Sequence, residues 1–75
     1  MTTTITQILI FKTNIQTVLD KHRVQHLLDT NTDIDQWNID QQDVDCVLRI
    51  ISDTLTPEQI ITLISNSGFT CSELE

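Results

Sequence analysis

The stretch ITQILIFKTNIQTVLD, residues 5–20, contains the corner between an apolar strand and a helix. The continuous apolar run Ile8–Phe11 lies within the predicted strand Ile5–Phe11 and predicts a central strand that is buried on much of both faces. Lys12-Thr13-Asn14 ends this strand, and a helix is predicted from Gln16 or Thr17 to Leu28. Chemistry is often found at such corners, because backbone N–H groups and loop side chains converge there. This corner has no Cys, no His, no glycine-rich loop and no paired carboxylates, so the sequence is more informative about fold than about activity.

The predicted helix has one apolar stripe. Val24, Leu27 and Leu28 share this stripe with Thr17, Asp20 and Lys21 from the preceding turns. Asp20 lies in the first turn, where a carboxylate complements the positive end of the helix dipole. The pattern predicts a helix that packs one face against the core.

The rest of the chain continues with two strand patterns, a helix and a final strand. Trp37 and Ile39 share one face of a predicted strand, Asp35–Asp40, and Cys46–Ser52 is typical of a third strand. Thr56-Pro57-Glu58-Gln59 is a strong helix start, with Thr as N-cap, Pro at the first position, and Glu and Gln completing a capping box. Asn66-Ser67-Gly68 ends that helix, and Phe69–Leu74 is a short fourth strand.

The resulting order, β-α-β-β-α-β, predicts an α+β fold of the ferredoxin-like class. In this fold a four-stranded antiparallel sheet carries both helices on one face. Right-handed crossovers place the first and third strands in the centre and the other strands at the edges. The apolar runs Ile8–Phe11 and Val47–Ile51 fall on the central strands, so sequence pattern and topology agree.

Length and charge narrow the classes of function. The chain has 75 residues, which corresponds to a single domain, predicted as residues 1–73, with Leu74-Glu75 interpreted as a cloning remnant. Four basic and eleven acidic residues give a net charge of −7, which disfavours nucleic-acid binding. No apolar run reaches the roughly 20 residues of a membrane span, and Met1-Thr2-Thr3-Thr4 lacks the basic region of a signal peptide. We therefore expect a soluble, cytoplasmic protein.

The acidic residues cluster between Asp29 and Asp45. Their spacing does not match a calcium-binding loop, which needs alternating oxygen ligands, a central Gly and a Glu at its twelfth position. The segment is interpreted as a solvated acidic edge. Cys46 and Cys71 are far apart in the sequence and form no C-x-x-C pair, so we expect free, half-buried thiols.

With these elements placed, the chain resembles the heavy-metal-associated domains of copper chaperones and metal-transporting ATPases. The resemblance covers nearly the whole length, and its strongest parts are the segments FKTNI at 11–15, WNID at 37–40, VLRI at 47–50, LTPEQII at 55–61 and Gly68-Phe69. Family members with a similar first segment continue with a C-x-x-C motif, whose two thiolates bind a soft ion such as Cu(I). In the register that keeps Val24 and Leu28 apolar, the two cysteine positions are Thr17 and Asp20. A shifted register places them at Ile15 and Val18, and both thiols are absent in either case.

The resemblance therefore implies the family's fold without its metal site. One hypothesis is an interaction or regulatory module that does not transfer metal and needs no cofactor. In the family the first loop also docks a partner of the same fold, so Lys12, Thr13, Asn14 and Gln16, together with Thr17, would form a docking patch for another protein. The alternative is that these are ordinary loop and cap residues.

A second hypothesis is a rebuilt metal site in a heavy-metal transport or detoxification protein. Asp20, His22 and Cys71 would bind Zn or Cu, and His22 and His26 have the spacing of ligands on a helix. Cys46 and Cys71 should lie roughly 10 Å apart because the first strand separates their strands, which is too far for a disulfide. No nucleophile lies beside a base in the sequence, so we expect no enzyme and assign no catalytic residue.

Two further interpretations concern the sheet edges. Trp37 is predicted to cover one edge of the core with its N–H at the surface, rather than to serve as an exposed binding residue. Asp33, Asp35 and Asp40 would repel an identical strand edge, which disfavours a dimer through the second strand. The fourth strand is less charged, so the protein is expected to be a monomer or a weak dimer.

Overall fold

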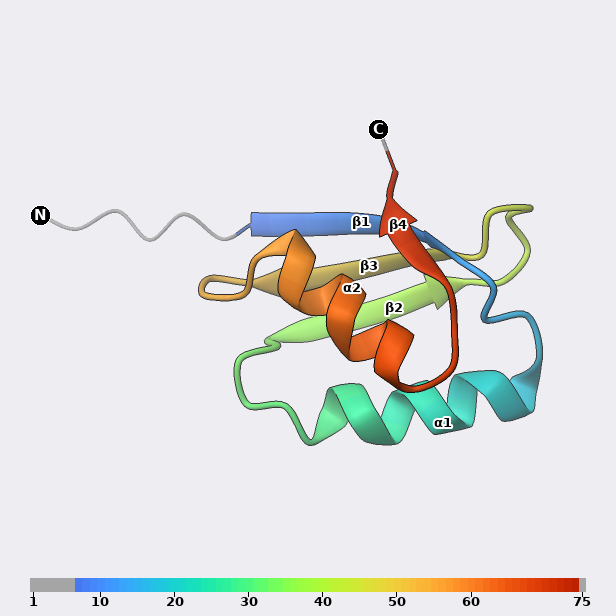
Figure 1. Cartoon of the computed structure of the whole chain (residues 1–75), viewed down its shortest axis with the longest axis horizontal. Coiled ribbons are helices and arrows are strands. Elements are labelled where there is room, and N and C mark those ends of the chain that lie inside the picture. The colour runs from blue at the N-terminus through green and yellow to red at the C-terminus, as the bar shows by residue number, and fades with distance from the viewer. Residues whose placement is uncertain (1–6, 75) are drawn as a thin grey trace, which may run out of the picture.

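The computed structural model describes residues 7–74 and contains one four-stranded antiparallel sheet and two helices (Figure 1). The elements in chain order are β1 (Gln7–Thr13), α1 (Val18–Asp29), β2 (Gln36–Asp40), β3 (Val47–Ser52), α2 (Pro57–Asn66) and β4 (Cys71–Glu73). The strands are ordered β2-β3-β1-β4, so β1 and β3 are central as predicted. This arrangement confirms the ferredoxin-like fold. The predicted strand residues Ile5 and Thr6 lie outside the described residues.

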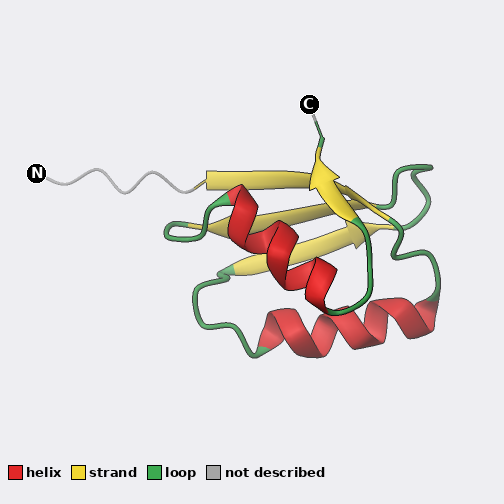
Figure 2. Ribbon diagram, in the orientation of Figure 1, coloured by secondary structure: helices red, strands yellow, loops and turns green. Residues whose placement is uncertain are grey.

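The core lies between the helices and one face of the sheet (Figure 2). Phe11 on β1 pairs with Leu48 on β3, and Leu9 pairs with Ile50, so these side chains share one face. The helices add buried residues to this face: Val24 and Leu28 from α1, as its apolar stripe predicted, and Ile60 and Ile64 from α2. Together these side chains form a single cluster that holds both helices against the sheet.

The opposite face of the sheet is open, and the prediction that β1 is buried on much of both faces was wrong. Ile8 is 61% exposed and Ile10 is 38% exposed, whereas their neighbour Phe11 is fully buried. Side chains alternate between the faces of a strand, so only every second residue of the run Ile8–Phe11 can face the helices. Because both helices lie on one side, the other side chains of the run remain on the solvent face.

The start and end of α2 agree with the sequence prediction. The Thr56 side chain accepts a hydrogen bond from the Gln59 N–H, and the Gln59 side chain accepts one from the Thr56 N–H. Pro57 occupies the first turn, and Gly68 follows the helix with φ +92°, a conformation that other residues rarely adopt. Thus local capping chemistry fixes both ends of the helix.

Trp37 packs partly buried against the core, as predicted. Its indole Nε1–H donates to the Asp29 carboxylate at 2.7 Å, which joins the edge strand β2 to the last residue of α1. A Trp side chain commonly combines apolar packing with one satisfied N–H at the surface. Trp37 is therefore a structural residue that links α1 to the sheet.

Candidate functional site

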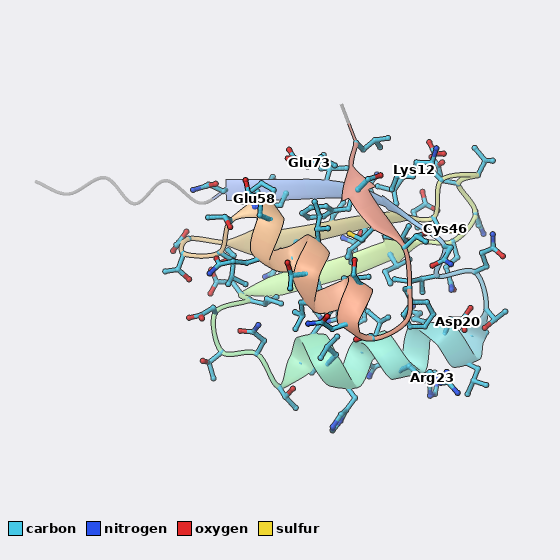
Figure 3. All side chains as sticks on the ribbon, viewed as in Figure 1. Lys12, Asp20, Arg23, Cys46, Glu58 and Glu73 are labelled. Carbon is cyan, nitrogen blue, oxygen red and sulfur yellow. The ribbon has the colours of Figure 1, made fainter. Side chains whose placement is uncertain are left out.

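The candidate site is the end of the molecule where β1 stops and α1 begins. The loop between β2 and β3, residues 41–46, lies against this corner: the Gln41 side chain donates to the carbonyl oxygens of Ile15 (3.2 Å) and Thr17 (2.8 Å). Ile15 is fully buried and anchors the corner in the core. Figure 3 shows Asp20 and Cys46 at this end of the molecule.

Helix α1 begins with a capping box formed by Thr17 and Asp20. The Thr17 hydroxyl accepts from the Asp20 N–H at 3.0 Å, and the Asp20 carboxylate accepts from the Thr17 N–H at 3.2 Å. The same carboxylate accepts from the Gln16 N–H at 3.4 Å. Both side chains are therefore used to satisfy backbone donors that have no partner within the helix. The predicted docking residue Gln16 has an exposed side chain beside this box.

The capping box of α2 was predicted from the sequence, whereas that of α1 was not. Thr17-Val18-Leu19-Asp20 has the same Thr-x-x-acceptor spacing as Thr56-Pro57-Glu58-Gln59. Asp in place of Glu or Gln hides the signal, because the usual pattern has a longer third-position side chain. The Thr-x-x-acceptor spacing was the one signal in the sequence that could have indicated the box.

The capping box also sets the charge of Asp20. Partial desolvation raises the pKa of Asp20. Hydrogen bonds from Thr17 and Gln16 and the positive charge of Arg23 lower it, and together they outweigh desolvation, so the pKa lies below the ordinary value of 3.8. The group is thus a carboxylate at neutral pH. Its negative charge lies at the positive end of α1 and complements the helix dipole.

Thr13 at the end of β1 donates two hydrogen bonds to the loop between β2 and β3. Its hydroxyl donates to the Cys46 carbonyl at 2.7 Å, and its backbone N–H donates to the Asp45 carbonyl at 3.0 Å. Cys46 is buried with φ +43°, a left-handed conformation that costs about 1–2 kcal/mol for an L-residue. The Thr13 hydroxyl bond therefore helps to hold a strained residue. Because Thr13 is only 7% exposed, it contributes no side chain to a docking surface.

The two other predicted docking residues have exposed side chains with partners of their own. The Asn14 side chain accepts from the Thr70 N–H at 2.9 Å and so joins the corner to the segment that enters β4. The Lys12 ammonium lies 3.8 Å from the half-exposed Asp45 carboxylate, and an ion pair so accessible to solvent contributes little to stability. The corner is thus bonded both to the loop between β2 and β3 and to the segment that enters β4.

Three exposed apolar side chains belong to the segments that form this end. Val18 is 71% exposed, Leu19 is 65% exposed, and Val44 in the loop between β2 and β3 is 92% exposed. We call these three residues the apolar end. Sequence reasoning did not select them, although apolar residues placed between the two members of a capping box cannot face the core through the α1 stripe of Val24 and Leu28.

The residues of the alternative metal site are not gathered into a ligand group. Within residues 7–74, no three side chains of His, Cys, Asp or Glu come together in a way that could hold an ion. Cys71 on β4 pairs with Thr13 on β1, whereas Cys46 precedes β3, which lies on the other side of β1. Both thiols are free. His22 and His26 are exposed on α1.

The chemistry of the available donors also fits Cu(I) poorly. Burial raises the pKa of the Cys71 thiol to about 11, so it stays protonated at neutral pH. The hydroxyl of Thr17 and the carboxylate of Asp20 are hard oxygen donors, whereas Cu(I) prefers soft thiolates. The oxygen donors at this end therefore do not match the soft coordination that Cu(I) prefers.

Comparison with known proteins places the fold but not a family. No family model matches the chain, and no curated protein matches it at a significant level. The crystal structure of oxidised MerP from Ralstonia metallidurans CH34 is similar with a TM-score of 0.79, covering 95% of this chain and 100% of the MerP chain. The sequence identity is 8%, so the similarity is one of fold.

Neither helix within residues 7–74 has the length and apolar character that crossing a bilayer would require.

Proposed function

We propose that this protein is an interaction or regulatory module on a heavy-metal-associated scaffold, and that it neither transfers metal nor catalyses a reaction. One observation carries the proposal: Thr17 and Asp20, the positions that the resemblance assigns to the metal-binding cysteines, form a capping box with exposed Val18 and Leu19 between them. At these two positions, side chains that cap the helix stand where the family has thiolates that bind metal. The exposed apolar residues supply a surface for a protein partner.

The apolar end is suited to protein binding because it is both exposed and fixed. Removing a Val or Leu side chain from water contributes about 1.5–3 kcal/mol when its burial is complete. The bonds from Gln41 and Thr13 hold the corner and the loop between β2 and β3 in one arrangement. A surface that is already ordered loses less conformational entropy when it binds.

The hydrogen bonds of four hydroxyl groups support a structural function for those side chains. The hydroxyl of Thr13 donates to a backbone carbonyl, and so does that of Ser52, at 2.6 Å to Asp33. Thr17 and Thr56 accept from helix N–H groups. A catalytic hydroxyl would instead lie within hydrogen-bond reach of a general base.

Copper titration of matched variants tests the absence of metal transfer and the register together. We expect the native protein to remove no stoichiometric Cu(I) from a competing chelator, and Thr17→Cys/Asp20→Cys to bind one equivalent. The variant Ile15→Cys/Val18→Cys is the control for the shifted register, and it should not bind, because Ile15 is fully buried. Stoichiometric binding by the native protein would overturn the proposal and would favour the rebuilt site.

Site-specific crosslinking tests the interaction surface. A photoreactive residue replacing Leu19 is compared in cells with the same residue replacing Thr62, which is exposed on α2. We expect a discrete crosslinked product from position 19 that disappears when Val18→Ser and Val44→Ser are added. Identical products from both positions would show that the apolar end is not a specific surface.

A further inference from the structure

One edge of β1 is only partly covered by β4. In antiparallel strands the N–H and C=O of one residue point to the same side, and successive residues alternate. The Leu74 N–H donates to the Ile10 carbonyl at 3.0 Å, so Ile10 directs its backbone groups toward β4, and Ile8 does the same two residues earlier. β4 pairs only with Phe11–Thr13. Within residues 7–74, therefore, the N–H and C=O of Ile8 face an edge with no strand beside it.

A groove lies along this free edge. It has a volume of about 180 Å³, and its walls include Ile8, Ile10, Pro57, Glu73 and Leu74. Ile8 and Ile10 are among the exposed large apolar residues of the molecule. Unpaired backbone groups and apolar side chains thus occur together, which is the combination that binds an extended peptide.

The charges around the groove indicate the chemistry of its occupant. Glu73 lines the groove, and Glu58 follows the lining residue Pro57 at the start of α2; Figure 3 labels both glutamates near β1. In the described part of the chain, the one ion pair joins Lys12 to Asp45, so neither glutamate has a basic partner there. A basic side chain beside the groove would be attracted by both carboxylates.

We propose that β1 accepts an extended segment of a partner protein as an added strand, and that this segment alternates apolar residues and carries Lys or Arg. Main-chain bonds to Ile8 would provide affinity, and the glutamates would select the basic residue. A second copy of the chain is a poorer occupant, because two molecules of net charge −7 would bring their glutamates together. This edge is separate from the apolar end and does not depend on the function proposed for that surface.

Peptide titration followed by NMR tests the inference. The probe is the blocked peptide KVTVTVK, and the control is EVTVTVE, which has the same apolar residues and the opposite charge. We expect KVTVTVK to shift the amide signals of Ile8 and Ile10 in a saturable manner and to slow hydrogen exchange at Ile8. EVTVTVE should bind at least about tenfold more weakly because it is repelled by the glutamates. No shifts at millimolar KVTVTVK, or shifts centred on Val18 and Leu19, would overturn the proposal.

Two variants separate the backbone contribution from the charge contribution. Ile8→Pro removes the N–H that faces the free edge, whereas the neighbours Gln7 and Leu9 keep the bonds to β3, so binding should be lost with the fold retained. Glu58→Gln/Glu73→Gln should weaken KVTVTVK about tenfold, with Asp43→Asn in the distant loop as the matched control. Unchanged affinity in the glutamine variant would contradict the proposal even if Ile8→Pro fails to fold.

Discussion

The two helices of this protein start with the same cap but present different surfaces. In α1 the Thr17 hydroxyl accepts from Asp20, and in α2 the Thr56 hydroxyl accepts from Gln59, with each third-position side chain accepting from the N-cap N–H in return. Between the two capping residues, α1 has exposed Val18 and Leu19. At the same positions α2 has Pro57 and Glu58.

This difference distinguishes first-turn residues that stabilise a helix from first-turn residues that do not. Pro at the first helical position and an acidic residue in the first turn both favour a helix start, so the α2 sequence is explained by stability alone. Val18 and Leu19 add neither advantage and remain in water. Their presence at one helix start and not at the other is the reason for assigning binding to the α1 end.

The largest predicted effect tests whether both helices are anchored equally. Leu28→Ala in α1 and Ile60→Ala in α2 each remove a fully buried side chain from the common core, so each should reduce the free energy of unfolding by about 2–5 kcal/mol. Urea denaturation measures both. A cost below about 1 kcal/mol for Leu28→Ala alone would mean that α1 is loosely packed, and the exposed first turn would then follow from poor anchoring.

The next effect compares the caps directly. Thr17→Ala and Thr56→Ala each remove the hydroxyl that accepts from the third helical N–H, so each should cost about 1 kcal/mol of stability. Thr17→Ser and Thr56→Ser are the matched controls and should retain most of that stability. If Thr17→Ala cost nothing while Thr56→Ala did, Thr17 would not serve as a cap in solution.

Acid should distinguish the two caps, because only one of them ionises. The pKa of Asp20 is lowered in the folded protein, since its hydrogen bonds and Arg23 outweigh the opposing desolvation. A carboxyl group with a lowered pKa stabilises the fold above its unfolded pKa, near 3.8, and this contribution is lost as the pH falls through the lower folded value. The stability difference between native protein and Asp20→Asn should therefore vanish in strong acid.

The α2 cap provides the control for this acid effect. Gln59 has no titratable group, so Gln59→Ala should lower stability by the same amount at neutral pH and in acid. Urea denaturation of both variants at several pH values makes the comparison. A difference between native protein and Asp20→Asn that persists unchanged in acid would show that the carboxylate charge contributes nothing to the cap.

The sequence allowed the fold to be predicted because local patterns and topology agreed. Thr56-Pro57-Glu58-Gln59 marked a helix start, and the apolar runs of β1 and β3 marked the central strands. The same apolar run gave the wrong burial for Ile8 and Ile10, because a continuous run does not show which of its side chains face the helices. The α1 cap was missed because its third position has Asp20 where the usual pattern has Glu or Gln.

Other features of the candidate site depend on contacts between distant residues, which no local pattern encodes. Gln41 binds the carbonyls of Ile15 and Thr17 across 26 and 24 positions of sequence. Thr13 was predicted as a docking residue, yet its hydroxyl is directed inward to Cys46, 33 positions away. A hydroxyl residue at the end of a strand can face either way, and only the packing of the loop between β2 and β3 decides which.

The smallest predicted effect on stability is the most informative about function. Val18→Ser/Leu19→Ser changes two side chains that are 71% and 65% exposed, so the free energy of unfolding should change by no more than about 0.5 kcal/mol per site. Urea denaturation gives this value. In the crosslinking experiment, where position 19 carries the photoreactive residue, Val18→Ser should reduce the crosslinked product. A loss of stability well above about 1 kcal/mol would show that the two residues support the fold, since buried apolar contacts have costs of that size. The contrast with α2 would then concern packing, and the assignment of binding to α1 would no longer follow from it.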